Sequence, residues 1–199
     1  MEKILTEKDA LISEEQYLRE ENAGIRDLDG KYEFHLGKKI FMGGGSKEHN
    51  AISTNLTVLI GSVLLEKNYQ LYHSDMRTYA PATGSYFYPD LVLVRGEPEF
   101  KDGTFDNLTN PILVIEIFSK STASFDRGEK FKTYRDIPSL QHYLAISSTS
   151  SMIEHYHKIN DSEWKLKILT EERESLHLME GLKMSLKDIY RDVKFAEKD

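Results

Sequence analysis

Two stretches of the chain are apolar at nearly every position. They cover residues 90–94 and 111–117, and each carries a single charged side chain. Continuous apolar runs of this length are typical of β-strands that are covered on both faces, as in the middle of a sheet flanked by helices. The residues between them, 95–110, are polar and rich in glycine, aspartate and asparagine, which predicts a loop.

Three other stretches have the pattern of a helix. From about residue 47 to residue 67, the apolar side chains recur at spacings of three and four and share one helical face: Ile52, Leu56, Leu59, Ile60, Val63 and Leu64. Residues 124–136 form a second predicted helix, which Pro138 ends. Ser13 and Gln16 match a capping box, which predicts a short helix to about residue 21.

Shorter apolar segments predict further strands, and a short segment over residues 185–190 completes the domain. These segments are 31–42 with a break at Gly37, 69–79 as a strand pair or one irregular strand, 141–146, 152–158 and 164–169. Strands on both sides of two helices predict an α/β (α+β) fold with a mixed β-sheet flanked by helices. We expect residues 1–30 to form an N-terminal helical arm and residues 31–199 to form one domain.

Composition and charge exclude several classes of function. The chain has 199 residues and no cysteine, which excludes disulfides, cysteine-ligated zinc and thiol catalysis. Its 26 basic and 33 acidic residues give a net charge of −7, which argues against non-specific coating of nucleic acid but not against a local basic site. We expect a cytoplasmic protein without a membrane segment, since no window approaches the ~18 apolar residues of a span and the start lacks the apolar run of a signal peptide.

The single charges in the two apolar runs are Asp90 and Glu116. If these strands pair antiparallel, the start of one lies beside the end of the other, and the two carboxylates meet at one rim of the sheet. A carboxylate in such surroundings is costly unless it is paired, and Mg²⁺ is one solution. The alternative is that Asp90 caps a turn and Glu116 pairs with a nearby lysine or arginine.

The helix after Glu116 is locally basic. Residues 120–135 hold five basic side chains against two acidic ones, and Asp126, Lys130 and Tyr134 share one face. Taken alone, Asp126 and Lys130 are a surface salt bridge worth a few tenths of a kcal/mol. Taken with the acidic pair, Lys130 becomes a candidate for a metal–phosphate site.

Three segments together resemble a known bacterial family. They are 88–94 (YPDLVLV), 111–122 (PILVIEIFSKST) and 126–135 (DRGEKFKTYR). They resemble a family called putative restriction endonucleases, formerly a domain of unknown function, within the PD-(D/E)XK nuclease superfamily. The resemblance runs over most of the chain, and the string from Glu116 to Tyr134 is its most specific part.

The resemblance implies a restriction-endonuclease-like core that binds Mg²⁺ or Mn²⁺. Asp90, Glu116 and the main-chain carbonyl of Ile117 would be the metal ligands. The superfamily pattern has a lysine two residues after the glutamate, where this chain has Phe118. The resemblance therefore makes Lys130, on the following helix, the candidate for that role.

Several other side chains each have a functional and a structural interpretation. His49 would reach a phosphate from a helix N-terminus, or it would be a capping or surface residue. Ser119 and Ser121 would bind phosphate or, preferably, cap the helix. Tyr134 would touch substrate or pack.

Glu33, which matches an acidic residue of the family, would add a carboxylate, although a solvent-facing strand residue is preferred. Asp126 is a further substrate-side candidate. His155 and His157 alternate on one strand face and are interpreted as surface residues, since spacing offers no third ligand.

Three functions follow from these observations. The first is a metal-dependent endonuclease acting on DNA, with a homodimer expected by analogy. The second is a nuclease-fold module that binds nucleic acid or assembles without efficient catalysis, and the third is a hydrolase of small phosphate esters. A set of late apolar residues would bury in a dimer interface or complete the monomer core: Leu169, Leu176, Leu178, Met179 and Leu182.

Overall fold

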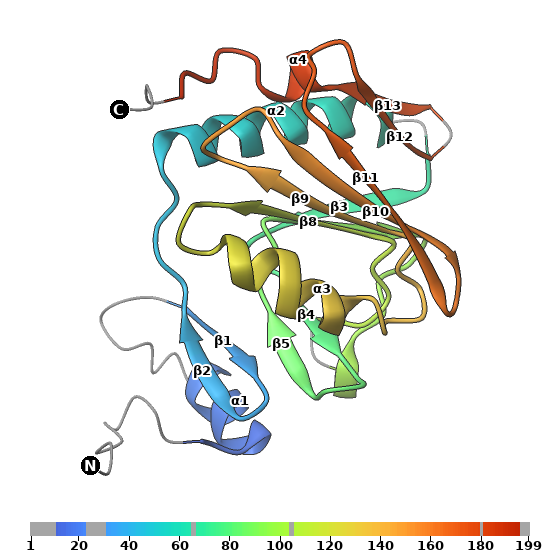
Figure 1. Ribbon diagram of the computed structural model, residues 1–199. Coiled ribbons are helices and arrows are strands. Elements are labelled where there is room, and N and C mark those ends of the chain that lie inside the picture. Colours follow the sequence, from blue (N-terminus) through green and yellow to red (C-terminus); the bar gives the residue numbers. More distant parts are fainter. Residues whose placement is uncertain (1–10, 23–30, 65–66, 104–105, 180, 196–199) are drawn as a thin grey trace.

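A six-stranded mixed sheet forms the centre of the computed structural model, which describes residues 11–22, 31–64, 67–103, 106–179 and 181–195 (Figure 1). The strand order is β11-β10-β9-β8-β6-β3. The strands span β3 Tyr69–His73, β6 Leu91–Arg95, β8 Leu113–Phe118, β9 His142–Ser147, β10 Ile153–Asn160 and β11 Glu163–Leu169. Strands β6 and β8, the two apolar runs of the sequence, are interior strands with a neighbour on each side, as predicted.

The pairing of the central strands sets the positions of their side chains. Strand β6 runs antiparallel to β8, with Leu91 opposite Ile115. Strand β8 runs parallel to β9, with Leu113 opposite His142. A parallel pair needs a crossover connection, and the predicted helix after β8 supplies it.

One face of the sheet is covered by helix α2 (Lys47–Leu64), which Figure 1 shows above the strands. Its predicted apolar face is buried through Ile52, Leu56 and Ile60. Helix α4 (Leu186–Ile189) and a hairpin, β12 (Ser175–Met179) and β13 (Leu182–Ser185), complete the same layer. Leu169, Leu176, Leu178 and Leu182 are buried in this core, and Met179 packs against it. The late apolar residues therefore complete the monomer core, and that surface is not free for a dimer.

The other face of the sheet carries the crossover helix. It begins as a π-helical segment, η3 (Phe125–Lys130), and continues as α3 (Phe131–Tyr134). This confirms a helix within the predicted range of 124–136, although its first part has the wider π-type hydrogen bonding. Such segments occur frequently at functional sites.

A second, five-stranded sheet packs below the first, in the order β2-β1-β5-β4-β7. Its strands are β1 Tyr32–His35, β2 Lys38–Phe41, β4 Arg77–Ala80, β5 Ser85–Phe87 and β7 Asn107–Leu108. Strands β1 and β2 flank the predicted break, where Gly37 has a φ of 84° that suits glycine. The segment predicted as strand over 69–79 is divided between the sheets, since β3 joins the first and β4 the second.

The predicted loop over 95–110 is only partly irregular. It contains strand β7 and a short 3₁₀ helix, η2 (Lys101–Gly103). The sequence pattern indicates neither element, because two or three residues are too few to show a period.

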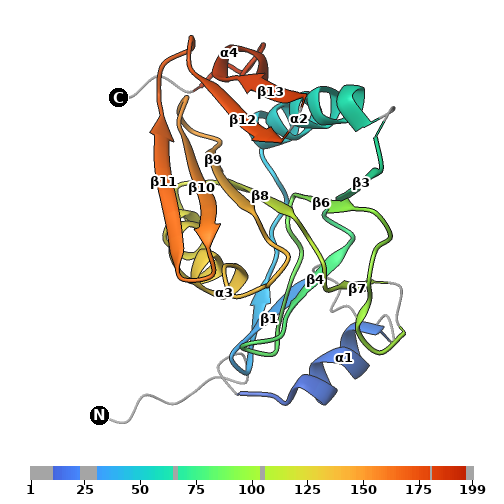
Figure 2. The same cartoon turned by 90° about the vertical axis from the view of Figure 1, so that its right-hand side faces the viewer.

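Helix α1 (Glu14–Asn22) lies against the second sheet, as Figure 2 shows beside β1 and β4. The amide of Gln16 donates to Ser13 Oγ at 3.1 Å, which confirms the predicted cap. Tyr17 is buried and stacks on Phe34, with ring centroids 5.1 Å apart. The proposed boundary of the arm at residue 30 lies outside the described residues and stays a prediction.

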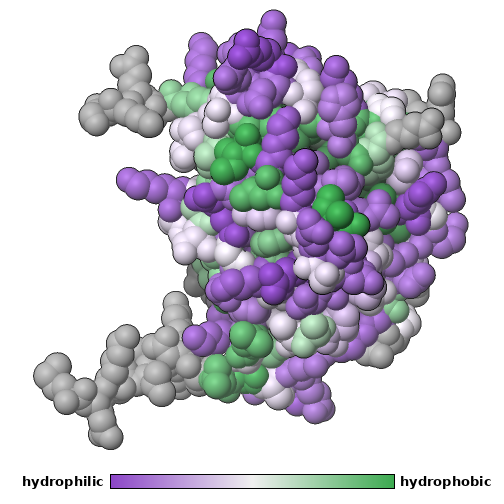
Figure 3. Space-filling model, turned by 45° about the vertical axis from the view of Figure 1, so that its right-hand side comes forward, coloured by the Kyte–Doolittle hydropathy of each residue, from purple (hydrophilic) through white to green (hydrophobic). Residues whose placement is uncertain are grey.

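The surface is mostly polar on the face shown in Figure 3, where hydrophobic side chains form small groups among hydrophilic ones. None of the helices that the structure describes is long and apolar enough to span a membrane.

Candidate active site

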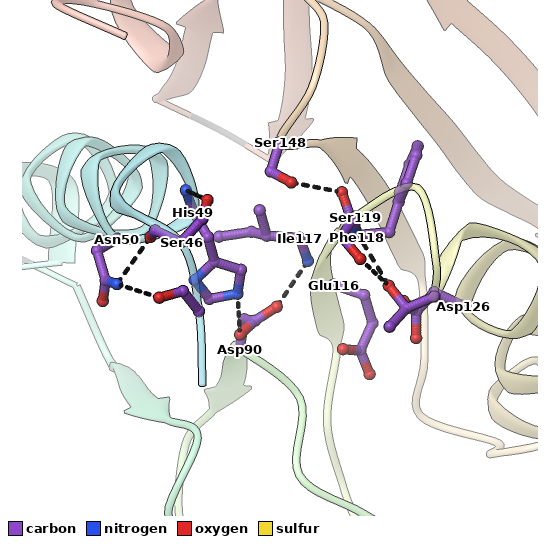
Figure 4. Close-up of polar contacts among 12 residues, drawn as sticks. Ser46, His49, Asn50, Asp90, Glu116, Ile117, Phe118, Ser119, Asp126 and Ser148 are labelled. Carbon is purple, nitrogen blue, oxygen red and sulfur yellow. Dashed lines mark hydrogen bonds and ion pairs between the residues drawn. The ribbon is translucent and has the colours of Figure 1, made fainter. Parts of the chain in front are cut away.

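The structure brings Asp90 and Glu116 to one end of the central strands. Asp90 directly precedes β6, and Glu116 is the fourth residue of β8. Asp90 Oδ2 accepts a hydrogen bond of 2.6 Å from the amide of Ile117 (Figure 4). The antiparallel register predicted from the sequence is the reason for this contact, because it sets the start of β6 beside the end of β8.

His49, in the first turn of α2, approaches the other side of Asp90. Its Nε2 lies 2.9 Å from Asp90 Oδ1 (Figure 4). The hydrogen bond with Asp90 raises the pKa of His49, against the effect of burial. The second ring nitrogen, Nδ1, is buried and has no hydrogen-bond partner. His49 therefore belongs to the site and not only to the end of the helix.

Gly45 is part of the same arrangement. A Cβ atom at this position would lie 2.5 Å from His49 Nδ1, whereas one at Gly44 would meet nothing within 4 Å. The preceding chain can run this close to the imidazole only because residue 45 has no side chain. Gly45 therefore allows His49 to face Asp90.

Lys130 is the centre of the second half of the site. Its Nζ lies 2.8 Å from Glu33 Oε1, 3.1 Å from Glu116 Oε1 and 3.4 Å from Asp126 Oδ1. All four residues are buried, with Lys130 only 4% exposed. The alternative of a surface salt bridge between Asp126 and Lys130 is wrong, because the helix face that carries them packs onto the sheet.

The solvent-facing interpretation of Glu33 is also wrong. Glu33 is 3% exposed, since its strand, β1, is covered by the crossover helix at this point. Its Oε1 accepts from the amide of Tyr88 at 3.0 Å as well as from Lys130. Glu33 thus links the two halves of the chain that build the site.

Phe118 occupies the position at which the superfamily pattern has its lysine. It is buried in the hydrophobic cluster on the crossover-helix face of the sheet. Lys130 reaches Glu116 from the helix instead. An ammonium group thus lies beside Glu116 although the strand position holds phenylalanine, and the role of Lys130 stays a prediction.

Burial and charge act against each other in this cluster. Burial raises the pKa of Glu116 well above its usual range, and Lys130 opposes that shift. Burial would lower the pKa of Lys130, but Glu116, Glu33 and Asp126 together hold it well above its usual value. Four carboxyl side chains face one lysine and one histidine, so the site has more acidic than basic side chains. Such an excess favours the binding of a cation.

The structure places one of the remaining candidates, Tyr134, against Glu116 and the other two, Ser119 and Ser121, in a turn outside the buried cluster. The Tyr134 hydroxyl donates to Glu116 Oε1 at 3.3 Å, and its side chain is fully buried, so it packs and orients Glu116. Ser119 Oγ lies 2.9 Å from Ser121 Oγ, in the turn before the crossover helix. The helix N-cap is Ser124, without a side-chain cap bond, so the preferred capping interpretation of the two serines is not supported by the described contacts.

No group of three or more histidine, aspartate or glutamate side chains is arranged to hold a metal ion among the described residues. Asp90 Oδ2 accepts a hydrogen bond from the Ile117 amide, and Asp90 Oδ1 forms an ion pair with His49. Glu116 Oε1 accepts a hydrogen bond from Lys130. The residue types fit a divalent cation, because hard cations prefer carboxylate and carbonyl oxygens.

The sequence interpretation missed a histidine cluster outside this site. His155 is buried and not a surface residue, and His142 on the neighbouring strand lies beside it. The signal was present in the sequence: strands 141–146 and 152–158 are joined by a short turn, so they pair antiparallel and place His142 opposite His157.

Comparison with known proteins identifies the family to which the chain is similar. The family model described as "Putative restriction endonuclease" matches residues 14–191. Two uncharacterized proteins of Synechocystis sp. are similar over most of their length. One is 37% identical over 156 residues, covering 78% of this chain and 86% of the relative. The other is 36% identical over 185 residues, covering 92% and 94%.

A solved structure shows the same fold. It is described as that of a putative nuclease belonging to DUF820 from Anabaena variabilis, with a TM-score of 0.73. The match has 16% identity and covers 90% of this chain and 97% of the other. The predicted α+β, restriction-endonuclease-like fold is thereby confirmed. With a family model that matches nearly the whole chain, this protein belongs to the putative restriction endonuclease family.

Proposed function

We propose that the protein is a metal-dependent endonuclease that hydrolyses phosphodiester bonds of DNA. The observation that carries the proposal is the group of four carboxylates around Lys130 and His49 at the end of the two central strands. Membership of the family supports nuclease activity. Metal dependence, DNA as substrate and the roles of single residues are our inference from the chemistry of the group.

Asp90, Glu116 and the carbonyl of Ile117 would hold Mg²⁺ or Mn²⁺. The amide of Ile117 faces Asp90, and the carbonyl of a strand residue points to the same side as its amide. When bound, such an ion supplies a Lewis acid for the phosphate and lowers the pKa of its water. The excess of carboxylates over cations supports this fit.

Lys130 has two roles in the proposal. Its charge lowers the pKa of Glu116 against the larger effect of burial, and so favours the deprotonated form that a metal ligand needs. The same charge opposes the negative charge that develops on a phosphate in the transition state. Glu33 and Asp126 hold the ammonium group in place, and Tyr134 orients Glu116.

His49 is the proposed contact to the phosphate. It lies in the first turn of α2, where anions are favoured, and its Nδ1 is without a partner among the described contacts. Asp90 holds the ring and favours its charged form. Ser119 and Ser121, exposed or half-buried in the turn after β8, are further candidates for phosphate binding.

A plasmid assay tests the proposal. Supercoiled DNA is incubated with Mg²⁺ or Mn²⁺ and with wild type, Asp90→Asn, Glu116→Gln and the matched control Glu129→Gln. Glu129 lies in the same crossover helix, is exposed and pairs with Lys132. We expect the control to nick DNA like wild type, and the two site variants to lose metal-dependent nicking. Cleavage that survives Asp90→Ala combined with Glu116→Ala would refute the assignment.

A second function has an observation in its favour. Both oxygens of Asp90 are engaged, one by the Ile117 amide and the other by His49. Phe118 stands where the superfamily pattern has its lysine. Both features suit a nuclease fold that binds nucleic acid or assembles without efficient cleavage. A DNA fragment shifted in EDTA but never cut with metal would support this alternative.

Many nucleases of this fold act as dimers, in which two sites cut the two strands of a duplex. We therefore propose that the active form is a homodimer. Light scattering of the protein with and without DNA tests this, and a monomer under both conditions would contradict it.

A further inference from the structure

Three histidines meet on two neighbouring strands. His155 and His157 are two positions apart on β10 and so point to the same face, and His142 on β9 lies opposite His157. The Lys158 amide donates to the Gln141 carbonyl, so Lys158 and Gln141 form a hydrogen-bonded pair of the antiparallel ladder. Such pairs alternate with pairs that lack mutual hydrogen bonds, and His157 with His142 is a pair of the second kind. Side chains in such pairs lie closest together.

The side-chain contacts confirm this proximity. His142 Nδ1 lies 3.0 Å from His155 Nε2. The ring of His157 stacks on that of His142, with centroids 4.6 Å apart and an interplanar angle of 14°. His157 is exposed, whereas His142 and His155 are buried.

This cluster is separate from the candidate active site. His142 lies on the face of the sheet with Leu144 and Ile146, under the layer formed by α2 and the β12–β13 hairpin. Glu116 lies on the opposite face, toward Lys130 on the crossover helix. The register also separates them along the strands, because His142 pairs with Leu113 and not with Glu116.

We propose that His142, His155 and His157 form a binding site for a divalent transition-metal ion of the Zn²⁺ class. Zn²⁺ is often held by three imidazoles with a fourth position open to water. With Zn–N bonds of about 2.0–2.1 Å in tetrahedral geometry, two ligand nitrogens lie roughly 3.3 Å apart. The 3.0 Å between His142 Nδ1 and His155 Nε2 is close to this spacing.

The third ligand requires one rearrangement. In the structure, the three rings do not converge on a single point. The exposed His157 can leave its stack on His142 and turn a ring nitrogen toward the gap between the other two. An ion there would tie β9 to β10, and through His142, which hydrogen-bonds the backbone of Leu178, to the β12–β13 hairpin.

The ionisation of the rings suits a metal ligand. Burial lowers the pKa of His142 to about 3 and that of His155 to about 4. Both imidazoles are therefore neutral at pH 7 and offer a lone pair, as metal binding requires. The hydrogen bond between His142 and Leu178 orients the ring in the way that outer-shell partners orient ligating histidines. Two lysines on β11 oppose a cation here, Lys167 opposite His155 and Lys165 opposite His157.

Calorimetric titration of Zn²⁺ into the full chain tests the site. Phenylalanine replaces one histidine at a time, because it keeps a flat ring and removes the nitrogens. We expect wild type to bind one Zn²⁺ per chain more than His155→Phe or His157→Phe, or to bind that ion at least tenfold more tightly. His73→Phe is the matched control, since His73 is an exposed strand histidine on β3, at the far edge of the same sheet.

Zinc stoichiometry and affinity that are the same in wild type, His155→Phe and His157→Phe would overturn the proposal. Because His157 is exposed, its variant folds even if His155→Phe does not, and circular dichroism checks both. Substitution of Co²⁺ gives a second readout, since visible absorption bands of a nitrogen-ligated ion should be lost in both variants and kept in His73→Phe. Failure of the nuclease proposal leaves these expectations unchanged, because an ion at Asp90 and Glu116 contributes equally to wild type and to every histidine variant.

Discussion

Replacing Lys130 by methionine perturbs the charge balance of the candidate site most directly. Methionine keeps an unbranched apolar side chain and removes the charge, so Glu33, Glu116 and Asp126 lose the ammonium group that lies 2.8, 3.1 and 3.4 Å from them. Removing one partner of a buried ion pair costs about 3–5 kcal/mol, because the other charge is left uncompensated. We expect Lys130→Met to lower the free energy of unfolding at pH 8 by about that amount.

The cost of this substitution should depend on pH. Burial raises the pKa of Glu33 and of Glu116 even with Lys130 present, and the pKa values rise further without it. A carboxyl whose pKa is raised on folding stabilises the protein fully below its unfolded value of about 4.3, and that contribution is lost as the pH rises through the folded value. The difference between wild type and variant therefore grows from pH 5 to pH 8, by up to about 1.4 kcal/mol per pH unit for each proton involved.

Urea unfolding of both proteins at pH 5 and pH 8 measures this effect. Lys132→Met is the matched control, because Lys132 lies on the same helix, is exposed and pairs with Glu129. The control should change the free energy of unfolding by no more than about 0.5 kcal/mol. A cost below about 1 kcal/mol for Lys130→Met at pH 8, or an equal cost at both pH values, would refute the view that Lys130 neutralises the buried carboxylates.

Three further predictions follow from single contacts. Gly45→Ala should displace the His49 ring and reduce nicking as strongly as His49→Gln does, whereas Gly44→Ala should have no effect; equal activities of the two alanine variants would contradict this. Because His49 has a raised pKa, its contribution to stability is complete below about pH 6.5 and is lost as the pH rises through the raised value. In urea unfolding, His49→Gln should therefore cost about 1–2 kcal/mol at pH 6 and less at pH 9, and a cost that grows with pH would exclude the ion pair. Leu176→Ala should cost about 2–4 kcal/mol and the exposed Leu166→Ala under 1 kcal/mol by chemical denaturation, independent of protein concentration; a concentration-dependent cost would place Leu176 in a dimer interface.

The central strands and the long helix were predictable because their signals are local. An apolar run long enough for a doubly covered strand identifies β6 and β8, and the spacing of Ile52, Leu56 and Ile60 identifies the buried face of α2. That Asp90 and Glu116 need a partner was predictable for the same reason, since a charge within such a run is costly when it is unpaired.

The sheet that each strand joins was harder to predict from the sequence. For residues 69–79 the sequence left open a strand pair or one irregular strand, and it did not indicate that β3 and β4 enter different sheets. The hairpin of β12 and β13 was recognised only as a group of apolar residues, because both strands are short and one carries a register shift. Pairing with distant strands decides such segments, and no local period records it.

By itself, the sequence determined the fold class, the order of the main elements and the two carboxylates at the rim of the central strands. Only the tertiary structure decided which charges those carboxylates meet. Glu33 and Lys130 are 97 positions apart and come into contact because β1 and the crossover helix pack on one another. Local pattern encodes which face of an element is apolar, whereas the partner that covers that face depends on packing over the whole chain. Buried charges and histidine clusters are set by that packing.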